Sequence, residues 1–334
     1  MASCFLLFKK HSVKVFLSFF VFLLFSGCNN SDKYLVVYTS VDEVYSSKIF
    51  KEFEKATGIK IKPVYDVESA KAVGLAKRLL AEKNNPQADV FWNSEPLQTA
   101  ILAKNNVFDS LNEINTDIYI NSSYYDKHKR WFALGERYRV IIINKNFVKK
   151  EPTRLNDILR GDFIGKNAIS YPYMGTTAAH FVALYHKIGE KKFIELLNLI
   201  KNSKTKFLAG NSVVKDMVSK GRVLGGIVDT DDANVGLKHN EPIKKIYYNQ
   251  NSDGVFGIFS TVSLIKHASH PKEAREFIKF LLNKNIEKKL ISEGLFESSV
   301  FKGGERTNIK SWTLNPADYV NDKTQVFNLL KNIL

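Results

Sequence analysis

Apolar runs alternate with amphipathic stretches along most of the chain. Residues 34–38 (YLVVY) form a continuous apolar, β-branched run, typical of a strand buried on both faces of a parallel sheet. A helical stretch follows, with Ile49, Phe50 and Phe53 on one side, and ends at Gly58. The same alternation predicts further strands at 59–65, 89–92, 140–143, 167–170, 226–228 and 257–264. It predicts further helices at 69–83, 154–159, 176–188, 213–219 and 270–283, and one that Asn93-Ser94-Glu95-Pro96 opens.

Strands that alternate with helices at this spacing predict an α/β fold, in which mostly parallel sheets carry helices on both faces. The 334 residues are enough for two lobes, each with a core of its own. No low-complexity linker separates the halves, so we expect strands to cross between the lobes. We place the first lobe at 34–136 and 257–312, the second at 137–256, and a C-terminal helical segment at 313–334.

The first 28 residues have the layout of an export signal. Lys9, Lys10 and Lys14 come before the uncharged run VFLSFFVFLLF at 15–25, and small residues follow it. A bilayer span takes about 20 apolar residues, so this run is too short to cross one. We therefore predict a signal peptide over 1–27 that is absent from the mature protein.

The signal ends in Leu24-Phe25-Ser26-Gly27-Cys28, which resembles a bacterial lipobox, although Phe25 departs from the usual aliphatic residue. In such a motif the chain is cut before a cysteine that receives lipid. Several acyl chains anchor a protein stably, because each buried CH₂ contributes about 0.8 kcal/mol. We therefore expect a lipid anchor at Cys28, a tether over 28–33 and a place in the cell envelope, facing the periplasm or the outside. The alternative is an ordinary secreted protein with an incidental cysteine.

Composition and charge narrow the classes of partner. Cys4 and Cys28 are the only cysteines, so a disulfide framework and a cysteine metal site are excluded from the body, which also lacks Walker A, HExxH and CxxC motifs. The net charge of +15 becomes +12 when the three lysines of the signal are removed. The remaining lysines are scattered and form no Arg-rich stripe, so we expect no nucleic-acid partner. Attraction to anionic lipids or solutes explains the charge, and a lysine-rich genome explains it equally well.

Six stretches occur in the order typical of one known family. They are VYTSVD at 37–42, FEKATGIKIKPV at 53–64, NNPQADVFWNSE at 84–95, GTTAA at 175–179, GNSVVKD at 210–216 and DTDDAN at 229–234. His270-Pro271 before a helix rich in Ala, Phe and Leu is similar to that family as well. The chain thus resembles the family 1 extracellular solute-binding proteins of the ferric-iron type, the capture subunits of ABC importers.

The resemblance implies a two-lobed fold like that of the type II periplasmic binding proteins, with crossing strands between the lobes and a ligand cleft. It also implies a permease and an ATPase as partners of a monomeric protein that binds and releases without catalysis. The implied ligand is iron(III) or a phosphorylated or carboxylated organic anion, and we expect no cofactor other than such bound iron.

Ligands of open parallel sheets lie beyond the carboxyl ends of the strands, where loops and helix N-termini meet. Residues that flank the predicted strands at that edge are therefore candidates for the cleft. We predict ligand contacts from Thr39, Ser40, Asp42, Asn93, Ser94, Glu95, Arg137, Tyr173, Gly175, Thr176, Thr177, Asp231 and Asp232.

Two features of this set favour an anion. Gly175-Thr176-Thr177 opens a predicted helix, where free N–H groups, two hydroxyls and the helix dipole point together. A plain N-cap explains one threonine but not both together with the glycine; for Asn211-Ser212, which also begins a helix, a plain N-cap is at least as good an explanation. Arg137 and Arg139, two residues apart, point the same way and suit a phosphate or carboxylate, unless they are simply a solvated pair.

The pair Asp231-Asp232 bears on whether the protein binds a metal ion. In ferric-binding members of the resembling family, two adjacent tyrosines occupy the corresponding turn. Carboxylates are oxygen ligands for hard cations, so Asp231 and Asp232 are candidate metal ligands. Alternatively, they accept hydrogen bonds from an amine or from sugar hydroxyls, or they form a solvated helix N-terminus. The tyrosine pairs Tyr124-Tyr125 and Tyr247-Tyr248 lie elsewhere in the sequence.

We expect no catalytic residue, because no Ser-His-Asp grouping stands out and the histidines lack the spacing of metal ligands. A secreted hydrolase could use Asp231 or Asp232 with Glu95 as paired carboxylates. That enzyme, and a surface adhesin or antigen without a transport role, are the alternatives to a solute-binding protein.

Overall fold

The computed structural model describes residues 33–66 and 72–334. The predicted signal peptide, Cys28 and the tether up to residue 32 therefore lie outside the described residues. Residues Tyr34–Leu334 form one compact unit. Within the described part of the chain, no helix is both long enough and apolar enough to cross a membrane.

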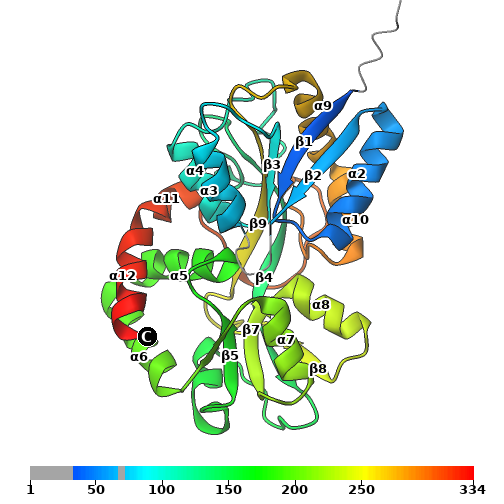
Figure 1. Cartoon of the computed structure of the whole chain (residues 1–334). Coiled ribbons are helices and arrows are strands. Elements are labelled where there is room, and N and C mark those ends of the chain that lie inside the picture. Colours follow the sequence, from blue (N-terminus) through cyan, green and yellow to red (C-terminus); the bar gives the residue numbers. More distant parts are fainter. Residues whose placement is uncertain (1–32, 67–71) are drawn as a thin grey trace, which may run out of the picture. The chain divides into compact units, whose positions relative to one another are not determined.

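The strands form a single mixed sheet of ten strands (Figure 1), in the order β2-β1-β3-β9-β4-β7-β5-β6, with β8 paired to β4 and β10 paired to β9. Their bounds are β1 (Tyr34–Thr39), β2 (Lys60–Tyr65), β3 (Val90–Asn93), β4 (Phe132–Asn144), β5 (Asn167–Ser170), β6 (Lys206–Leu208), β7 (Gly225–Asp229), β8 (Ile243–Ile246), β9 (Val255–Leu264) and β10 (Ser311–Trp312). Strands near the two ends of this order pair in parallel, whereas β4 and β9 run antiparallel to each other and to β7 and β3.

The long strand β4 joins the two ends of the sheet. Its first half pairs with β9 from Phe132 to Tyr138, and its second half pairs with β7 from Arg139 onward. All of its thirteen residues are buried, including two arginines and a glutamate. The apolar pattern predicted only 140–143 as a strand, because Gly135, Glu136 and the arginines interrupt the run of apolar residues.

Helices cover both faces of the sheet. They are α2 (Glu43–Thr57), α3 (Val73–Ala81), α4 (Pro96–Lys104), α5 (Gly175–Ile188), α6 (Glu190–Asn202), α7 (Asn211–Ser219), α8 (Thr230–Lys238), α9 (Pro271–Leu281), α10 (Lys284–Glu293), α11 (Pro316–Tyr319) and α12 (Lys323–Ile333). In Figure 1, α5, α6 and α12 lie on one side of β5 and β7, and α7 and α8 lie on the other. The predicted helix at 154–159 is a 3₁₀ helix, Leu155–Leu159.

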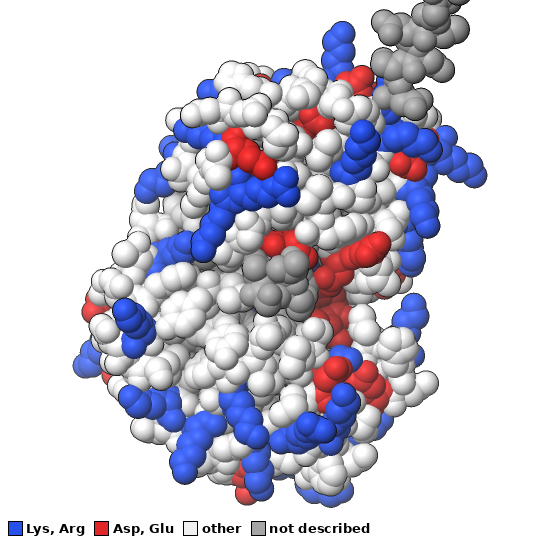
Figure 2. Space-filling view, viewed as in Figure 1, with Lys and Arg blue, Asp and Glu red and all other residues white. Residues whose placement is uncertain are grey.

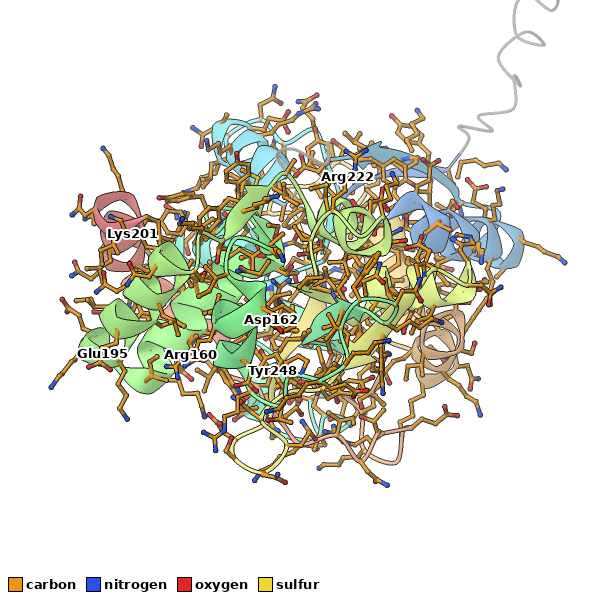
Figure 3. The ribbon with its side chains drawn as sticks, turned by 90° about the horizontal axis from the view of Figure 1, so that it is seen from below. Arg160, Asp162, Glu195, Lys201, Arg222 and Tyr248 are labelled. Carbon is orange, nitrogen blue, oxygen red and sulfur yellow. The ribbon has the colours of Figure 1, made fainter. Side chains whose placement is uncertain are left out.

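Two hydrophobic clusters form the core. One draws its buried residues from 35–134 and 259–301, and the other draws them from 138–258 and 319–330, with Leu97 added. The C-terminal helix α12 packs with the second cluster through Val326 and Leu330. Its end is also held by Lys201 of α6, whose Nζ donates to the backbone oxygen of Ile333 at 2.8 Å (Figure 3). The predicted α/β fold is confirmed, and the boundaries of the lobes remain predictions.

Candidate functional site

A polar cavity lies where several strands end and several helices begin. Its volume is about 40 Å³ and it is partly open to solvent, so a ligand larger than a small ion would extend beyond its walls. It is lined by Ser94, Arg137, Ser170, Met174, Gly175, Thr176, Ala209, Gly210, Asn211, Asp229, Asp231 and Asp232. β3, β5 and β7 end at or next to these residues, and α5, α7 and α8 begin among them or next to them.

The first turns of α5 and α7 both face this cavity, through Gly175 and Thr176 and through Asn211. The residues before them, Met174 and Gly210, make no side-chain hydrogen bond to the helix N-terminus. Gly175 has φ +58°, a conformation that a glycine adopts without strain. Because the first N–H groups of a helix have no partner within it, two sets of donors and two positive dipole ends meet at one cavity.

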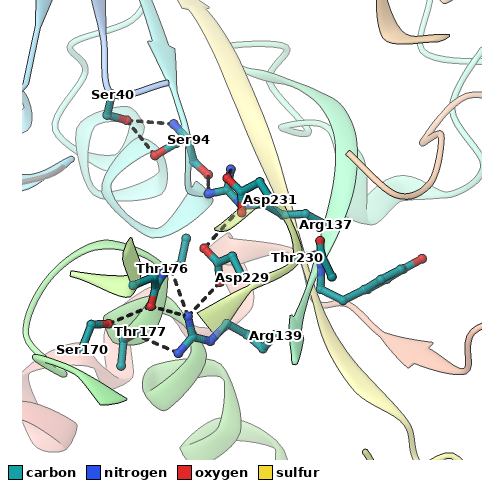
Figure 4. A network of polar contacts seen from close by, with 12 residues as sticks. Ser40, Ser94, Arg137, Arg139, Ser170, Thr176, Thr177, Asp229, Thr230 and Asp231 are labelled. Carbon is teal, nitrogen blue, oxygen red and sulfur yellow. Dashed lines mark hydrogen bonds and ion pairs between the residues drawn. The ribbon is translucent and has the colours of Figure 1, made fainter. Parts of the chain in front are cut away.

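Buried Arg139 ties three of these elements together (Figure 4). Only 1% of its surface is exposed. Its Nη1 donates to Asp229 Oδ1 at 2.8 Å and to Asn211 Oδ1 at 3.0 Å, and its Nη2 donates to Thr177 Oγ1 at 3.1 Å. The guanidinium therefore fixes the end of β7 and the starts of α5 and α7 relative to β4. Arg139 itself is not among the residues that line the cavity.

Arg137 does line the cavity and is 4% exposed. Its Nη2 donates to the backbone oxygen of Ser94 at 2.8 Å. Its Nη1 lies 3.3 Å from Asp231 Oδ2, and its Nε lies 3.4 Å from Asp229 Oδ2. Burial lowers the pKa of Arg137, but the carboxylates of Asp231 and Asp229 raise it above its usual value. The guanidinium therefore stays charged. Both arginines are thus buried and paired, and a solvated pair is excluded.

Three carboxylates gather at the start of α8, beside the cavity. One oxygen each from Asp229, Asp231 and Asp232 lies within 4.8 Å of the others, an arrangement that could hold a cation. Burial raises the pKa of Asp229, but Arg139 and Arg137 outweigh it and hold the pKa below its usual value. Figure 2 shows acidic side chains near the middle of the face that it draws.

Ser94 is held in place from behind. Ser40 Oγ donates to Asn93 Oδ1 at 2.6 Å, and it accepts a hydrogen bond from the backbone N–H of Ser94 at 2.8 Å. The backbone oxygen of Ser94 in turn accepts a hydrogen bond from the guanidinium of Arg137, as Figure 4 shows. Ser40 and Asn93 therefore support the wall of the cavity without lining it.

The predicted ligand-binding residues divide into two groups. Those that line the cavity are Ser94, Arg137, Gly175, Thr176, Asp231 and Asp232. Those that do not are Thr39, Ser40, Asp42, Asn93, Glu95, Tyr173 and Thr177.

Most members of the second group have another contact. Thr39 Oγ1 accepts from the N–H of Val41 at 3.1 Å, and the exposed ring of Tyr173 packs edge-on against Phe327. Glu95 caps α4, because its carboxylate accepts from the N–H groups of Leu97 and Gln98 at 2.6 and 3.0 Å. Burial raises the pKa of Glu95 to about 7. The hydrolase alternative needs this carboxylate, which is occupied in capping a helix.

Six lining residues lie outside the predicted ligand-binding set: Ser170, Met174, Ala209, Gly210, Asn211 and Asp229. Ser170 is the last residue of β5, so the rule of strand ends could have found it. Ala209 and Gly210 follow β6, whose three residues are too few to show an apolar pattern.

Neither tyrosine pair lines the cavity. The hydroxyl of Tyr124 donates to Glu136 Oε1 at 3.1 Å, and that of Tyr247 donates to Glu297 Oε2 at 2.6 Å. Burial raises the pKa of both phenols above the usual value, which opposes the phenolate form. Among the described residues that line the cavity there is no tyrosine, so a metal there would have carboxylate rather than phenolate ligands.

Comparison of the chain with known proteins identifies its family. Residues 38–287 match the model of the family described as bacterial extracellular solute-binding protein. The chain is 26% identical over 281 residues to the Fe(3+)-binding periplasmic protein of Serratia marcescens, covering 82% of this chain and 81% of the relative. It is 27% identical over 281 residues to the putative 2-aminoethylphosphonate-binding periplasmic protein of Salmonella typhi, covering 80% and 79%.

Solved structures agree on the fold. Iron-bound HitA from Pseudomonas aeruginosa superposes with a TM-score of 0.79 at 19% identity, over 90% of this chain and 99% of that one. AfuA from Actinobacillus pleuropneumoniae, with exogenous fructose-6-phosphate bound, gives 0.77 at 18% identity, over 90% and 98%. The predicted resemblance and the predicted periplasmic-binding-protein-like fold are thereby confirmed. The chain belongs to the family of bacterial extracellular solute-binding proteins.

Proposed function

We propose that the protein captures a small organic solute with an oxyanion group, such as a phosphonate, phosphate or carboxylate, in the cavity between α5, α7 and α8. The observation that carries this proposal is the meeting of two helix N-termini, neither capped by the preceding side chain, at one cavity that Arg137 also lines. Backbone N–H groups and dipole ends at such places favour negative charge.

Carboxylates also line this cavity or lie next to its lining. Asp229 is shared by two guanidiniums and Asp231 by one, while Asp232 lines the cavity next to them. Carboxylate oxygens accept hydrogen bonds from an ammonium group, so we propose a zwitterion that carries both an oxyanion and an amine rather than a plain anion. A relative named for 2-aminoethylphosphonate and a structural neighbour with a sugar phosphate support this ligand class.

Iron(III) is the second candidate. The three close carboxylates favour it, as do the relatives named for ferric iron. Against it stand the two buried guanidiniums beside those carboxylates and the absence of a tyrosine among the described lining residues. Iron measured by mass spectrometry after incubation with ferric citrate and desalting tests this candidate, since stoichiometric retention would favour it and no retention would remove it.

Capture is the first half of the proposed role, and delivery is the second. We propose that the mature chain begins at Cys28, is anchored there by lipid in the cell envelope, and passes its solute as a monomer to an ABC permease with a cytoplasmic ATPase. The lobes would be residues 34–136 with 257–312, and residues 137–256, with 313–334 following them. A ligand that touches both lobes would stabilise a closed state, because it binds that state more tightly. Mass spectrometry of the N-terminal peptide, with Cys28→Ser as control, tests the anchor.

Native mass spectrometry of the purified protein, followed by thermal denaturation with added ligands, tests the capture role. We expect a bound organic anion of unchanged mass, and stabilisation by 2-aminoethylphosphonate or fructose-6-phosphate. A ligand at 100 times its Kd stabilises by about 2.7 kcal/mol, which shifts Tm by several degrees. No shift with any phosphonate, phosphate or carboxylate would contradict the proposal, and turnover of the ligand would favour the enzyme alternative.

A further inference from the structure

A cluster of polar side chains lies outside the cavity and holds the helix that supplies two of its carboxylates. This Glu297 cluster consists of Asn234, Lys245, Tyr247 and Glu297. Glu297 Oε1 accepts from Lys245 Nζ at 2.6 Å and from Asn234 Nδ2 at 3.0 Å. Its Oε2 accepts from the hydroxyl of Tyr247 at 2.6 Å. None of the four residues lines the cavity.

The carboxylate of Glu297 is held in its charged form. Burial raises its pKa, but the hydrogen bonds from Lys245 and Tyr247 outweigh burial and hold the pKa below its usual value. Lys245 also donates to Asn234 Oδ1 at 2.8 Å, so Asn234 is held on both sides of its amide. The polar groups of the cluster are thus bonded to one another, partly through charge-assisted hydrogen bonds. Such bonds hold side chains in place more firmly than a solvated surface ion pair does.

The cluster connects strand β4, which carries Arg137, with helix α8, which carries Asp231 and Asp232. The backbone N–H of Glu297 donates at 2.8 Å to the oxygen of Glu136, the residue before Arg137 in β4. Asn234 lies three residues after Asp231 in α8, and therefore on the same side of that helix, one turn away. The start of α8 is also held to β4, because Thr230 Oγ1 accepts from the N–H of Tyr138 at 3.2 Å. Asn234 Nδ2 also donates to the backbone oxygen of Gly294 at 3.1 Å, and together these contacts hold the first turn of α8.

We propose that Glu297 is a positioning residue that sets the distance between Arg137 and the carboxylates of Asp231 and Asp232, and thereby the preference of the cavity for amine-bearing anions. This inference rests on the proposed function. An amine gains from a carboxylate only within hydrogen-bond reach, so a small rotation of α8 removes the gain. The oxyanion end of the ligand, held by α5 and α7, is unaffected by such a rotation.

The test compares two probes that differ only in the amine, 2-aminoethylphosphonate and ethylphosphonate, by isothermal titration calorimetry. For the unaltered protein we expect the amine-bearing probe to bind at least about tenfold more tightly, the gain typical of a hydrogen bond to a charged group. In Glu297→Ala we expect this ratio to fall to about threefold or less, with the affinity for ethylphosphonate unchanged. Glu297→Gln keeps an acceptor oxygen and should recover part of the ratio, and Tyr247→Phe should give an intermediate value.

Glu293→Gln is the matched control. Glu293 is the last residue of α10, lies four residues before Glu297 and pairs with exposed Lys48 at 3.0 Å. We expect it to leave the ratio unchanged. If Glu297→Ala does not fold, Glu297→Gln and Tyr247→Phe carry the test.

The possible outcomes separate the two proposals. If the unaltered protein binds neither probe, the proposed function fails. If it binds both probes equally, or if folded Glu297 variants keep the full preference for the amine while losing only thermal stability, the positioning role of Glu297 is overturned and the capture role stands.

Discussion

Arg139 and Asp229 face each other as cross-strand partners in β4 and β7, and Arg139 Nη1 donates to Asp229 Oδ1 at 2.8 Å. The pair is buried, and Asp229 also lies 3.4 Å from Arg137. One carboxylate thus serves both arginines of β4 at the point where α5, α7 and α8 begin. This joint explains how polar groups from distant parts of the chain keep fixed places around the cavity.

Arg139→Leu should destabilise the protein strongly. The change leaves Asp229 with less compensation in a buried place, and breaking such a pair typically costs about 3–5 kcal/mol. Chemical denaturation measures the loss. Arg275→Gln, which breaks the surface pair with Glu113, is the control and should cost less than about 1 kcal/mol. Equal losses in both variants would show that burial of Arg139 carries no special weight.

Thr176→Val should weaken both ligand binding and the fold, because Thr176 Oγ1 accepts from Asn211 Nδ2 at 3.1 Å and from Arg139 Nη1 at 3.4 Å. The change removes a hydroxyl from the first turn of α5 while keeping the size of the side chain. Thermal shifts with ethylphosphonate should shrink by the equivalent of about 1 kcal/mol, the net value of one hydrogen bond. Thr324→Val, at an exposed position of α12, should keep the full ligand-induced shift. A full shift in Thr176→Val would remove this hydroxyl from the site.

Asp232→Asn should reduce the preference for an amine without abolishing binding. The substitution removes a negative charge from the lining of the cavity. Titration with 2-aminoethylphosphonate should show an affinity lower by about tenfold, whereas ethylphosphonate should bind as well or better, since an acidic neighbour is gone. Loss of both affinities together would indicate that Asp232 contacts no amine and instead maintains the fold of the cavity.

His180 and Glu95 should give opposite dependences of stability on pH. Burial, with Arg139 nearby, lowers the pKa of His180 to about 3. In the unfolded chain His180 is protonated below about pH 6.5, whereas in the folded protein it stays neutral. Stability therefore decreases as pH falls below about 6.5. Burial raises the pKa of Glu95 to about 7. The folded protein takes up that proton first, so stability rises as pH falls from about 7 to about 4.5.

Urea denaturation between pH 7 and pH 5 measures both effects. Each group contributes a slope of up to about 1.4 kcal/mol per pH unit, and the two offset each other in the unaltered protein. As pH falls, His180→Gln should become more stable relative to the unaltered protein, and Glu95→Gln should become less stable. Parallel curves for all three proteins would contradict the burial of both charges.

Much of the fold could be predicted from short-range patterns. The buried strands β1 and β3 and the helices α5 and α9 follow from apolar runs and from glycine or proline at helix starts. The start of α5 at Gly175-Thr176 and the acidic first turn of α8 were also recognisable, because helix N-termini have strong local preferences. Strands with polar interruptions, such as β4, were only partly recognisable, since their polar groups are satisfied by distant partners.

The amino-acid sequence by itself determined the alternation of strands and helices, and with it the edge of the sheet where a ligand could lie. Only the tertiary structure decided how the polar groups at that edge divide between binding and support. Glu95 caps its own helix, and Arg139 pairs with Asp229 across ninety residues of chain. A strand end shows that a polar group is near the site, but the geometry of long-range packing decides which partner satisfies it.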